Sequence, residues 1–110
     1  MNVETKERNG VCILYVKGEM DLNSSPEIKK IFDKVFLTKE NKILINFKDM
    51  QYIDSSGLAT IVDFFKSIKE NKGQLVLCEL SEKIKKLFVI TRLDKLFKIL
   101  DTEEQAIGSF

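Results

Sequence analysis

The stretch from residue 43 to residue 78 decides the fold, and it reads ILINFKDMQYIDSSGLATIVDFFKSIKENKGQLVLC. It opens with an apolar run at residues 43–47 and closes with another at residues 75–78, and both have the length and branched side chains of strands. Between them, residues 56–71 carry apolar side chains at helical spacing, namely Leu58, Ile61, Val62, Phe65 and Ile68. Gly73 ends this helix. A strand, a helix and a strand in this order predict a right-handed crossover between parallel strands.

The residues before this unit predict a hairpin followed by a helix. Residues 11–16 form a β-rich run, residues 3–7 a weaker edge strand, and the Asn9-Gly10 pair between them is typical of a two-residue hairpin turn. A helix begins near Pro26, where the Ser24 or Ser25 side chain can accept a hydrogen bond from a first-turn amide. Its inward stripe consists of Ile28, Ile31, Phe32, Val35 and Phe36.

The residues after the unit predict two more helices and one strand. Ser81 is placed to cap a third helix, residues 96–100 form a short last strand, and Thr102 opens a terminal helix. The whole order predicts a single α/β domain over residues 1–110, with a mixed four- to five-stranded sheet, an N-terminal β-hairpin and about four helices.

Composition limits the classes of function. The chain has 110 residues with 18 Lys and Arg against 17 Asp and Glu, so the clear basic excess of a nucleic-acid-binding protein is missing. The stretch with Lys83, Lys85, Lys86, Arg92, Lys95 and Lys98 is therefore interpreted as a solvated surface. No apolar run approaches the ~20 residues that cross a bilayer, and no export signal is visible. We expect a cytoplasmic protein without direct membrane insertion, in which Cys12 and Cys78 are free thiols.

An enzymatic function is not expected. The sequence contains no histidine, so a serine or cysteine nucleophile lacks its usual base. It also lacks the Gly-x-Ser-x-Gly elbow and the glycine-rich loop that binds nucleotide phosphates. The pair Asp49 and Asp54 offers too few ligands for a cation. The sequence thus predicts no catalytic residue, no metal and no cofactor.

The candidate site is the segment Asp54-Ser55-Ser56-Gly57, where a strand leads into a helix. Free amides and the positive end of the macrodipole favour negative charge at a helix start, so a serine here can carry a phosphoryl group. Alternatively, Asp54, Ser55 and Ser56 serve only as caps. Glycine in a first turn costs roughly 1 kcal/mol relative to alanine, so a partner or a neighbouring loop is expected close to Gly57.

Three segments resemble the STAS family, in its branch of bacterial anti-sigma factor antagonists. The segment 46–50 followed by Ile53-Asp54-Ser55-Ser56-Gly57-Leu58 resembles the family signature, and Gly18-Glu19-Met20-Asp21 resembles its second characteristic turn. Residues 80–91 resemble the helix that follows the fourth strand in that family. The similarity spans essentially the whole chain.

The resemblance implies a phosphorylation switch. The serine directly after the aspartate is the acceptor in such proteins, which assigns the role to Ser55, with Ser56 as the alternative. The unphosphorylated form would bind an anti-sigma factor that is also a serine kinase, so that a sigma factor is released, and a serine phosphatase would reverse the modification. ATP and Mg²⁺ would belong to the kinase. The implied partner-binding residues are Gly18, Glu19, Asp21, Asn23, Ser24, Asp54, Ser55, Ser56, Gly57 and Leu58.

The same fold also implies an alternative function. It serves as a subunit of stress-sensing complexes and of membrane transporters, where no serine switch is required. A serine in the acceptor position favours the antagonist branch.

Overall fold

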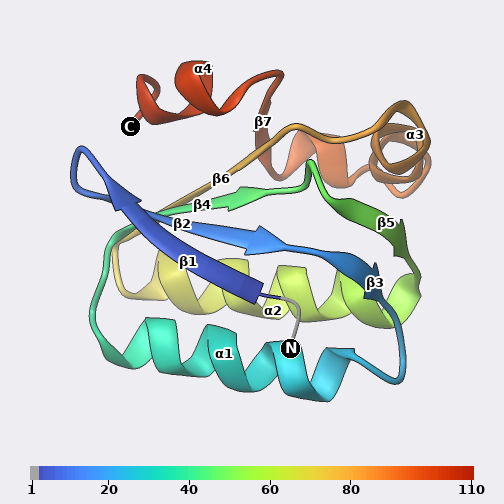
Figure 1. Ribbon diagram of the computed structural model, residues 1–110, viewed down its shortest axis with the longest axis horizontal. Helices are drawn as coiled ribbons and strands as arrows, with labels where there is room; N and C mark the ends of the chain where they lie inside the picture. The colour runs from blue at the N-terminus through green and yellow to red at the C-terminus, as the bar shows by residue number, and fades with distance from the viewer. Residues whose placement is uncertain (1–2) are drawn as a thin grey trace.

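The computed structural model describes residues 3–110, which form one α/β unit (Figure 1). Its elements are β1 (Val3–Arg8), β2 (Val11–Val16), β3 (Gly18–Met20), α1 (Ser25–Leu37), β4 (Lys42–Asn46), β5 (Met50–Ile53), α2 (Ser55–Glu70), β6 (Gln74–Cys78), α3 (Glu82–Ile90), the 3-10 turn η1 (Leu93–Lys95), β7 (Lys98–Leu100) and α4 (Glu103–Ile107). None of the described helices is long and apolar enough to span a bilayer.

The main sheet has five strands in the order β1-β2-β4-β6-β7. Strand β1 is antiparallel to β2, and the other neighbours are parallel. The hairpin turn has positive φ at both Asn9 and Gly10, as a type I′ turn requires. The predicted mixed sheet, opening hairpin and four helices are therefore confirmed.

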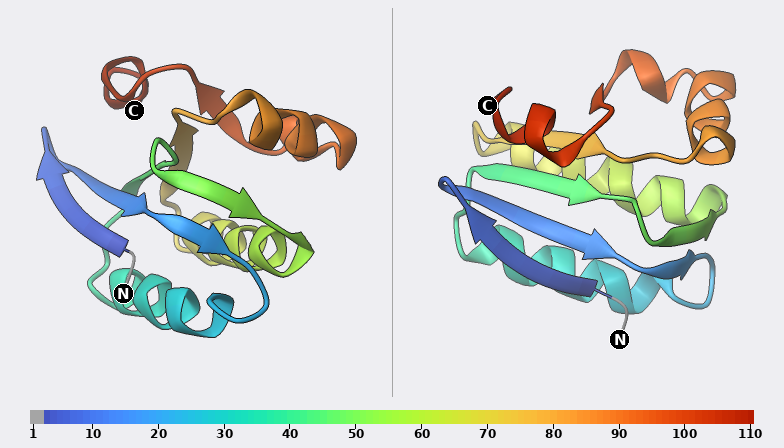
Figure 2. Two further views of the ribbon diagram at one scale, coloured as in Figure 1. Left: turned by 45° about the vertical axis from the view of Figure 1, so that its right-hand side comes forward. Right: turned by 45° about the horizontal axis from the view of Figure 1, so that its top comes forward.

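Both faces of the sheet are covered (Figures 1 and 2). Helices α1 and α2 lie on one face and bury Ile43 and Leu75, while α4 lies on the other and covers Leu44 and Val76. Because successive residues of a strand point to opposite faces, two-sided burial explains the continuous apolar runs of β4 and β6. Cys78 lies in the cluster under α4, and burial, then the nearby Glu79 carboxylate, raises the pKa of its thiol to about 12.

The edges of the main sheet differ from its centre. Strand β1 exposes charged side chains, and Lys17 pairs with its Glu4 at 2.9 Å. Strand β7, at the opposite edge, has only three residues.

Two strands were not predicted. Residues 49–58 were expected to connect a strand directly to a helix, but Met50–Ile53 form β5, which pairs in parallel with β3 in a separate two-stranded sheet. These strands are three and four residues long, and β5 is buried only at its two ends, so neither shows an alternating pattern. Their pairing with each other, rather than a recognisable sequence pattern, identifies them as strands.

Three finer predictions need correction. Ser24 precedes α1 but makes no capping hydrogen bond with its side chain, which is used in the preceding turn. Phe64 was missing from the predicted inward stripe of α2: it is buried and its ring stacks on Phe32 with centroids 4.3 Å apart, while the predicted Phe65 is half-buried and packs against Phe97. The last strand begins only at Lys98, because the Leu96 and Phe97 amides both donate to the Leu93 carbonyl and keep residues 93–97 in a turn.

Glu103 fixes α4 to the sheet. Its carboxylate accepts hydrogen bonds from the Tyr15 hydroxyl at 2.7 Å, the Asn46 amide at 2.9 Å and the Arg8 guanidinium at 2.6 Å. Burial alone would raise the pKa of Glu103, but these three hydrogen bonds together hold it below its ordinary value. Burial, then the hydrogen bond to Glu103, raises the pKa of Tyr15 to about 12.

We predict that Glu103→Gln destabilises the fold in a pH-dependent way. The folded-state pKa of Glu103 is lowered, so its charge stabilises the protein above the ordinary pKa of 4.5, and this contribution disappears as the pH falls through the folded value. Urea unfolding should show a loss of about 1.5–3 kcal/mol at pH 7 that shrinks toward pH 3.

The matched control is Glu104→Gln, whose carboxylate binds the same arginine but is 75% exposed, and which should change little. An equal loss for Glu103→Gln at both pH values would contradict a role for its charge.

Candidate functional site

Asp54 connects the start of α2 to the loop after β3. One oxygen of its carboxylate accepts the Gly57 amide at 3.1 Å, which caps α2, and the other accepts the Leu22 amide at 3.3 Å. Its own backbone amide donates to the Met20 carbonyl at 3.2 Å. Both segments singled out in the sequence, 18–24 and 54–58, are thereby held side by side.

Gly57 is buried against β3. A Cβ at this position would lie 2.4 Å from the Met20 carbonyl oxygen and 2.8 Å from the Ile53 side chain. The close neighbour expected from the sequence is thus a strand of the same chain. Only glycine lets α2 begin this near to β3.

The segment 18–24 is an internally bonded turn. The Asp21 carboxylate accepts the Asn23 amide at 2.9 Å and the Ser24 amide at 3.0 Å, while the Ser24 hydroxyl donates to the Glu19 carbonyl at 2.8 Å. Gly18 has φ of 80° and donates its amide to the Asp49 carbonyl at 2.9 Å. These polar groups hold the turn in shape and line a shallow hollow of about 460 Å³ on its outer side.

The two serines of the segment differ in accessibility. Ser55 is the first residue of α2 and is exposed, while Ser56 is half-buried. Ser55 also lines a groove of about 500 Å³ between the end of β5 and α3, and the groove's walls include Leu58, Leu87 and Ile90. Of the two candidate acceptors, Ser55 is the one that faces this groove.

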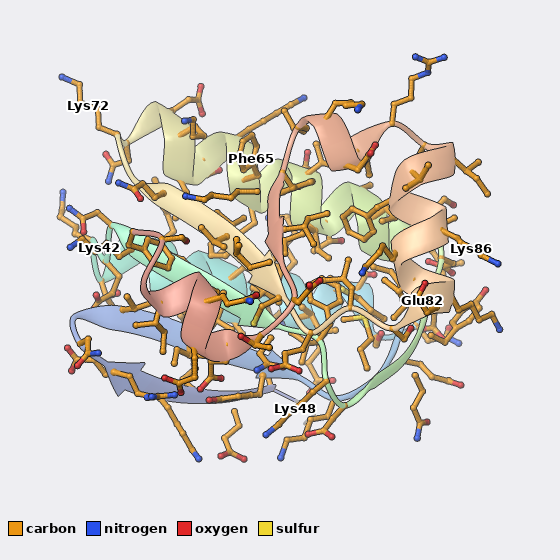
Figure 3. All side chains as sticks on the ribbon, turned by 90° about the horizontal axis from the view of Figure 1, so that it is seen from above. Lys42, Lys48, Phe65, Lys72, Glu82 and Lys86 are labelled. Atoms are coloured by element: carbon orange, nitrogen blue, oxygen red, sulfur yellow. The ribbon has the colours of Figure 1, made fainter. Side chains whose placement is uncertain are left out.

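Two lysines of α3 stand on the same groove. Lys83 and Lys86 line it, and Figure 3 shows Lys86 extending outward from α3. Within residues 3–110 neither lysine forms an ion pair, whereas Lys85 on the same helix lies near Glu82 and Asp101. The groove therefore carries two free positive charges beside Ser55.

This groove was not predicted from the sequence. Its lysines were interpreted as part of a solvated surface, and Ile90, which is 77% exposed, was given no role. A signal was present, because Val89 and Ile90 continue an apolar run beyond the inward stripe of Ile84, Leu87 and Phe88. What the sequence could not show is that this end of α3 faces Ser55.

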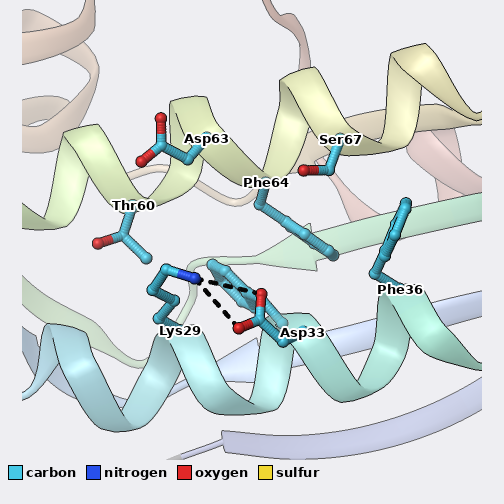
Figure 4. A pocket seen from close by; sticks show the side chains of 8 residues that line it. Lys29, Asp33, Phe36, Thr60, Asp63, Phe64 and Ser67 are labelled. Atoms are coloured by element: carbon cyan, nitrogen blue, oxygen red, sulfur yellow. Dashed lines mark hydrogen bonds and ion pairs between the residues drawn. The ribbon is translucent and has the colours of Figure 1, made fainter.

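A second hollow lies between α1 and α2 (Figure 4). It measures only about 50 Å³, and its rim carries the ion pair of Lys29 with Asp33 at 3.1 Å. That volume is far below the 300–1,000 Å³ of ordinary ligand pockets, so it is a packing gap. Residues 3–110 also hold no group of three or more His, Cys, Asp or Glu side chains that could bind a metal ion.

Comparisons with known proteins point to one family. The STAS domain model matches residues 2–106. An anti-sigma-B factor antagonist from Listeria monocytogenes is 34% identical over 111 aligned positions, which cover 99% of this chain and 96% of the relative.

Solved structures agree with this match. A crystal structure from Thermotoga maritima, described as a candidate anti-sigma factor antagonist, has a TM-score of 0.92 at 31% identity and covers 97% of this chain and 92% of its own. The phosphorylated form of SpoIIAA from Bacillus has a TM-score of 0.76 at 21% identity, with 97% of each chain covered, and so shares the fold.

We predict that Asp54→Ala both destabilises α2 and releases the loop at Leu22. Loss of the cap should lower the free energy of unfolding by about 1–2 kcal/mol. Ser81→Ala is the matched control, because Ser81 caps α3 through the Ile84 amide alone. Hydrogen exchange should accelerate at Leu22 in Asp54→Ala and not in Ser81→Ala. Unchanged exchange at Leu22 would show that Asp54 does not hold the loop.

We also predict that Gly57→Ala separates α2 from β3. Relieving the clash with the Met20 carbonyl requires a backbone shift, and such overpacking costs about 1–3 kcal/mol. Gly108→Ala is the control, since its added Cβ would meet only ordinary contacts at 3.6 Å or more. Equal stability of the two variants in thermal unfolding would refute the close approach at Gly57.

Proposed function

The chain belongs to the STAS family, and from this premise we propose that it is an anti-sigma factor antagonist whose binding is switched off by phosphorylation of Ser55. The name of the Listeria relative supports the first part of the proposal. The observation that carries the second part is the place of Ser55, which is exposed at the first position of α2 and directly follows the fixed Asp54. SpoIIAA, which shares this fold, has been solved in unphosphorylated and phosphorylated forms.

A phosphoryl group at Ser55 is compatible with the fold. The first turn of α2 contains no acidic residue, and both carboxylate oxygens of Asp54 are engaged by backbone amides. The helix start favours an anion, so the modification need not unfold α2. It adds about −1.5 to −2 charges to the surface, enough to repel an acidic partner.

The proposed partner surface divides into two kinds of residue. Asp21, Ser24, Asp54 and Gly57 hold the backbone in place, and Ser55, Glu19 and Asn23 present side chains to solvent. Leu22, which is 72% exposed, lies beside them and supplies an apolar contact that the sequence did not indicate. Gly18, Ser56 and Leu58 complete the proposed set.

The proposed partners act on this surface in turn. An anti-sigma factor with serine kinase activity binds the unmodified surface in the cytoplasm and then phosphorylates Ser55 with its own ATP and Mg²⁺. A serine phosphatase restores the binding form. The chain itself is a non-enzymatic binding module in this scheme.

The test is a binding series with the recombinant anti-sigma factor from the same genome. Ser55→Ala should bind as the unmodified chain does and should stay bound when ATP and Mg²⁺ are added. Ser55→Asp should bind at least tenfold more weakly, because it places a charge at the contact. Isothermal titration calorimetry gives the affinities, and mass spectrometry of the treated wild-type chain locates the phosphate.

Ser56→Ala and Ser56→Asp are the matched controls, and phosphate found on Ser56 would move the switch to that residue. Because Asp54 and not Ser55 caps α2, Ser55→Ala should lose clearly less than the ~2 kcal/mol of one helix cap in thermal unfolding. Equal affinities of Ser55→Ala and Ser55→Asp would rule out the switch and favour a non-switching STAS subunit.

A further inference from the structure

The groove beside Ser55 runs along an unpaired strand edge. Three consecutive residues of β5, 51–53, line it together with Asp54, although successive side chains of a strand point to opposite faces. A hollow that all three strand residues border is therefore located at the edge of β5 and not on one face. Within the described residues β5 pairs only with β3, because β6 ends at Cys78 and the chain then turns into α3.

The backbone direction of β5 agrees with an open edge. The Asp54 amide donates to the Met20 carbonyl on β3, and neighbouring residues of a strand direct their amides to opposite sides. The Ile53 amide is thereby turned away from β3, toward the open edge of the strand. An unpaired edge of this kind can accept an additional strand from another chain.

The groove offers apolar contacts above this edge. Ile84 and Leu87 of α3 and Leu58 of α2 line it. Two large side chains at the rim are exposed to solvent, Tyr52 by 44% and Ile90 by 77%. Exposed apolar groups that gather around one hollow are typical of a protein-binding site.

The charges around the groove specify the occupant. Lys83 and Lys86 form no ion pair within residues 3–110, and the one carboxylate among the lining residues, Asp54, is already engaged by two amides. The complementary occupant is apolar in its centre and carries Asp or Glu at its ends.

From these observations we infer that the groove binds an extended apolar segment of the partner, flanked by acidic side chains, which adds as a strand to the free edge of β5. The inference rests on the proposed function for the identity of the partner and for the switch. A phosphoryl group on Ser55 enters the same groove, pairs with Lys83 and Lys86, and repels the acidic flanks. The modification thus blocks the segment by competing for its charge partners.

The experiment uses two synthetic peptides with the same five-residue core of alternating Val and Thr, flanked on each side by two Glu or by two Lys. Each is titrated into the ¹⁵N-labelled full chain and followed by NMR. The acidic peptide should bind at least tenfold more tightly than the basic one, shift the amide signals of residues 51–54 and 84–90, and slow hydrogen exchange at Ile53.

The variants test each part of the inference. Lys83→Gln with Lys86→Gln should remove the preference for the acidic peptide, while Lys66→Gln with Lys69→Gln, on the exposed face of α2, should leave it unchanged. Ile90→Ser should weaken both peptides. A chain carrying phosphoserine at residue 55 should lose affinity for the acidic peptide alone.

Three results would overturn the inference: equal affinity for the two peptides, shifts confined to surfaces outside the groove, or no shift with either peptide at millimolar concentration. The outcome is separable from that of the proposed function. If the anti-sigma factor binds Ser55→Ala but is insensitive to the two groove lysines, the groove is wrong and the function stands. If the peptides bind as expected but no anti-sigma factor binds the chain, the groove stands and the proposed function is wrong.

Discussion

The candidate site depends on the two hydrogen bonds that the Asp54 carboxylate accepts. They come from the backbone amides of Leu22 and Gly57, which lie more than thirty residues apart in sequence. A capping aspartate normally serves only its own helix. Here it also sets the distance between α2 and the turn after β3, and the missing side chain of Gly57 allows that distance to be short. The position of Ser55 follows from both.

The central architecture could be predicted because burial on both faces of a strand produces a recognisable sequence pattern. Leu44 and Val76 lie under α4 while their neighbours lie under α1 and α2, so both strands appear as unbroken apolar runs. The caps at Ser81 and Thr102 were also visible, because short hydroxyl side chains before an amphipathic run have one common use.

The rest depended on tertiary contacts that no local pattern encodes. Strands β3 and β5 pair with each other, and with three and four residues they are too short to show a strand pattern in the sequence. Phe64 and Phe65 are adjacent and equally apolar, and the tertiary structure gives each its own neighbour: Phe64 stacks on Phe32, and Phe65 packs edge to face on Phe97. The sequence around Lys83 and Lys86 is typical of a solvated helix face. These lysines lie on the same groove as Ser55 because α3 packs across the end of β5.

The side chains and lengths of the edge strands have a consequence for self-association. The main sheet protects its outer edges in familiar ways: β1 exposes the charged Glu4, Lys6 and Glu7, and β7 is too short to serve as a template for another chain. The edge of β5 is also short, with four residues, but the side chains that it exposes, Gln51 and Tyr52, are uncharged. Two copies that met edge to edge here would bring the lysines of both α3 helices together, and like charges would oppose the contact. The same side chains that leave this edge open to an acidic strand therefore guard it against fibril-like stacking of the protein on itself.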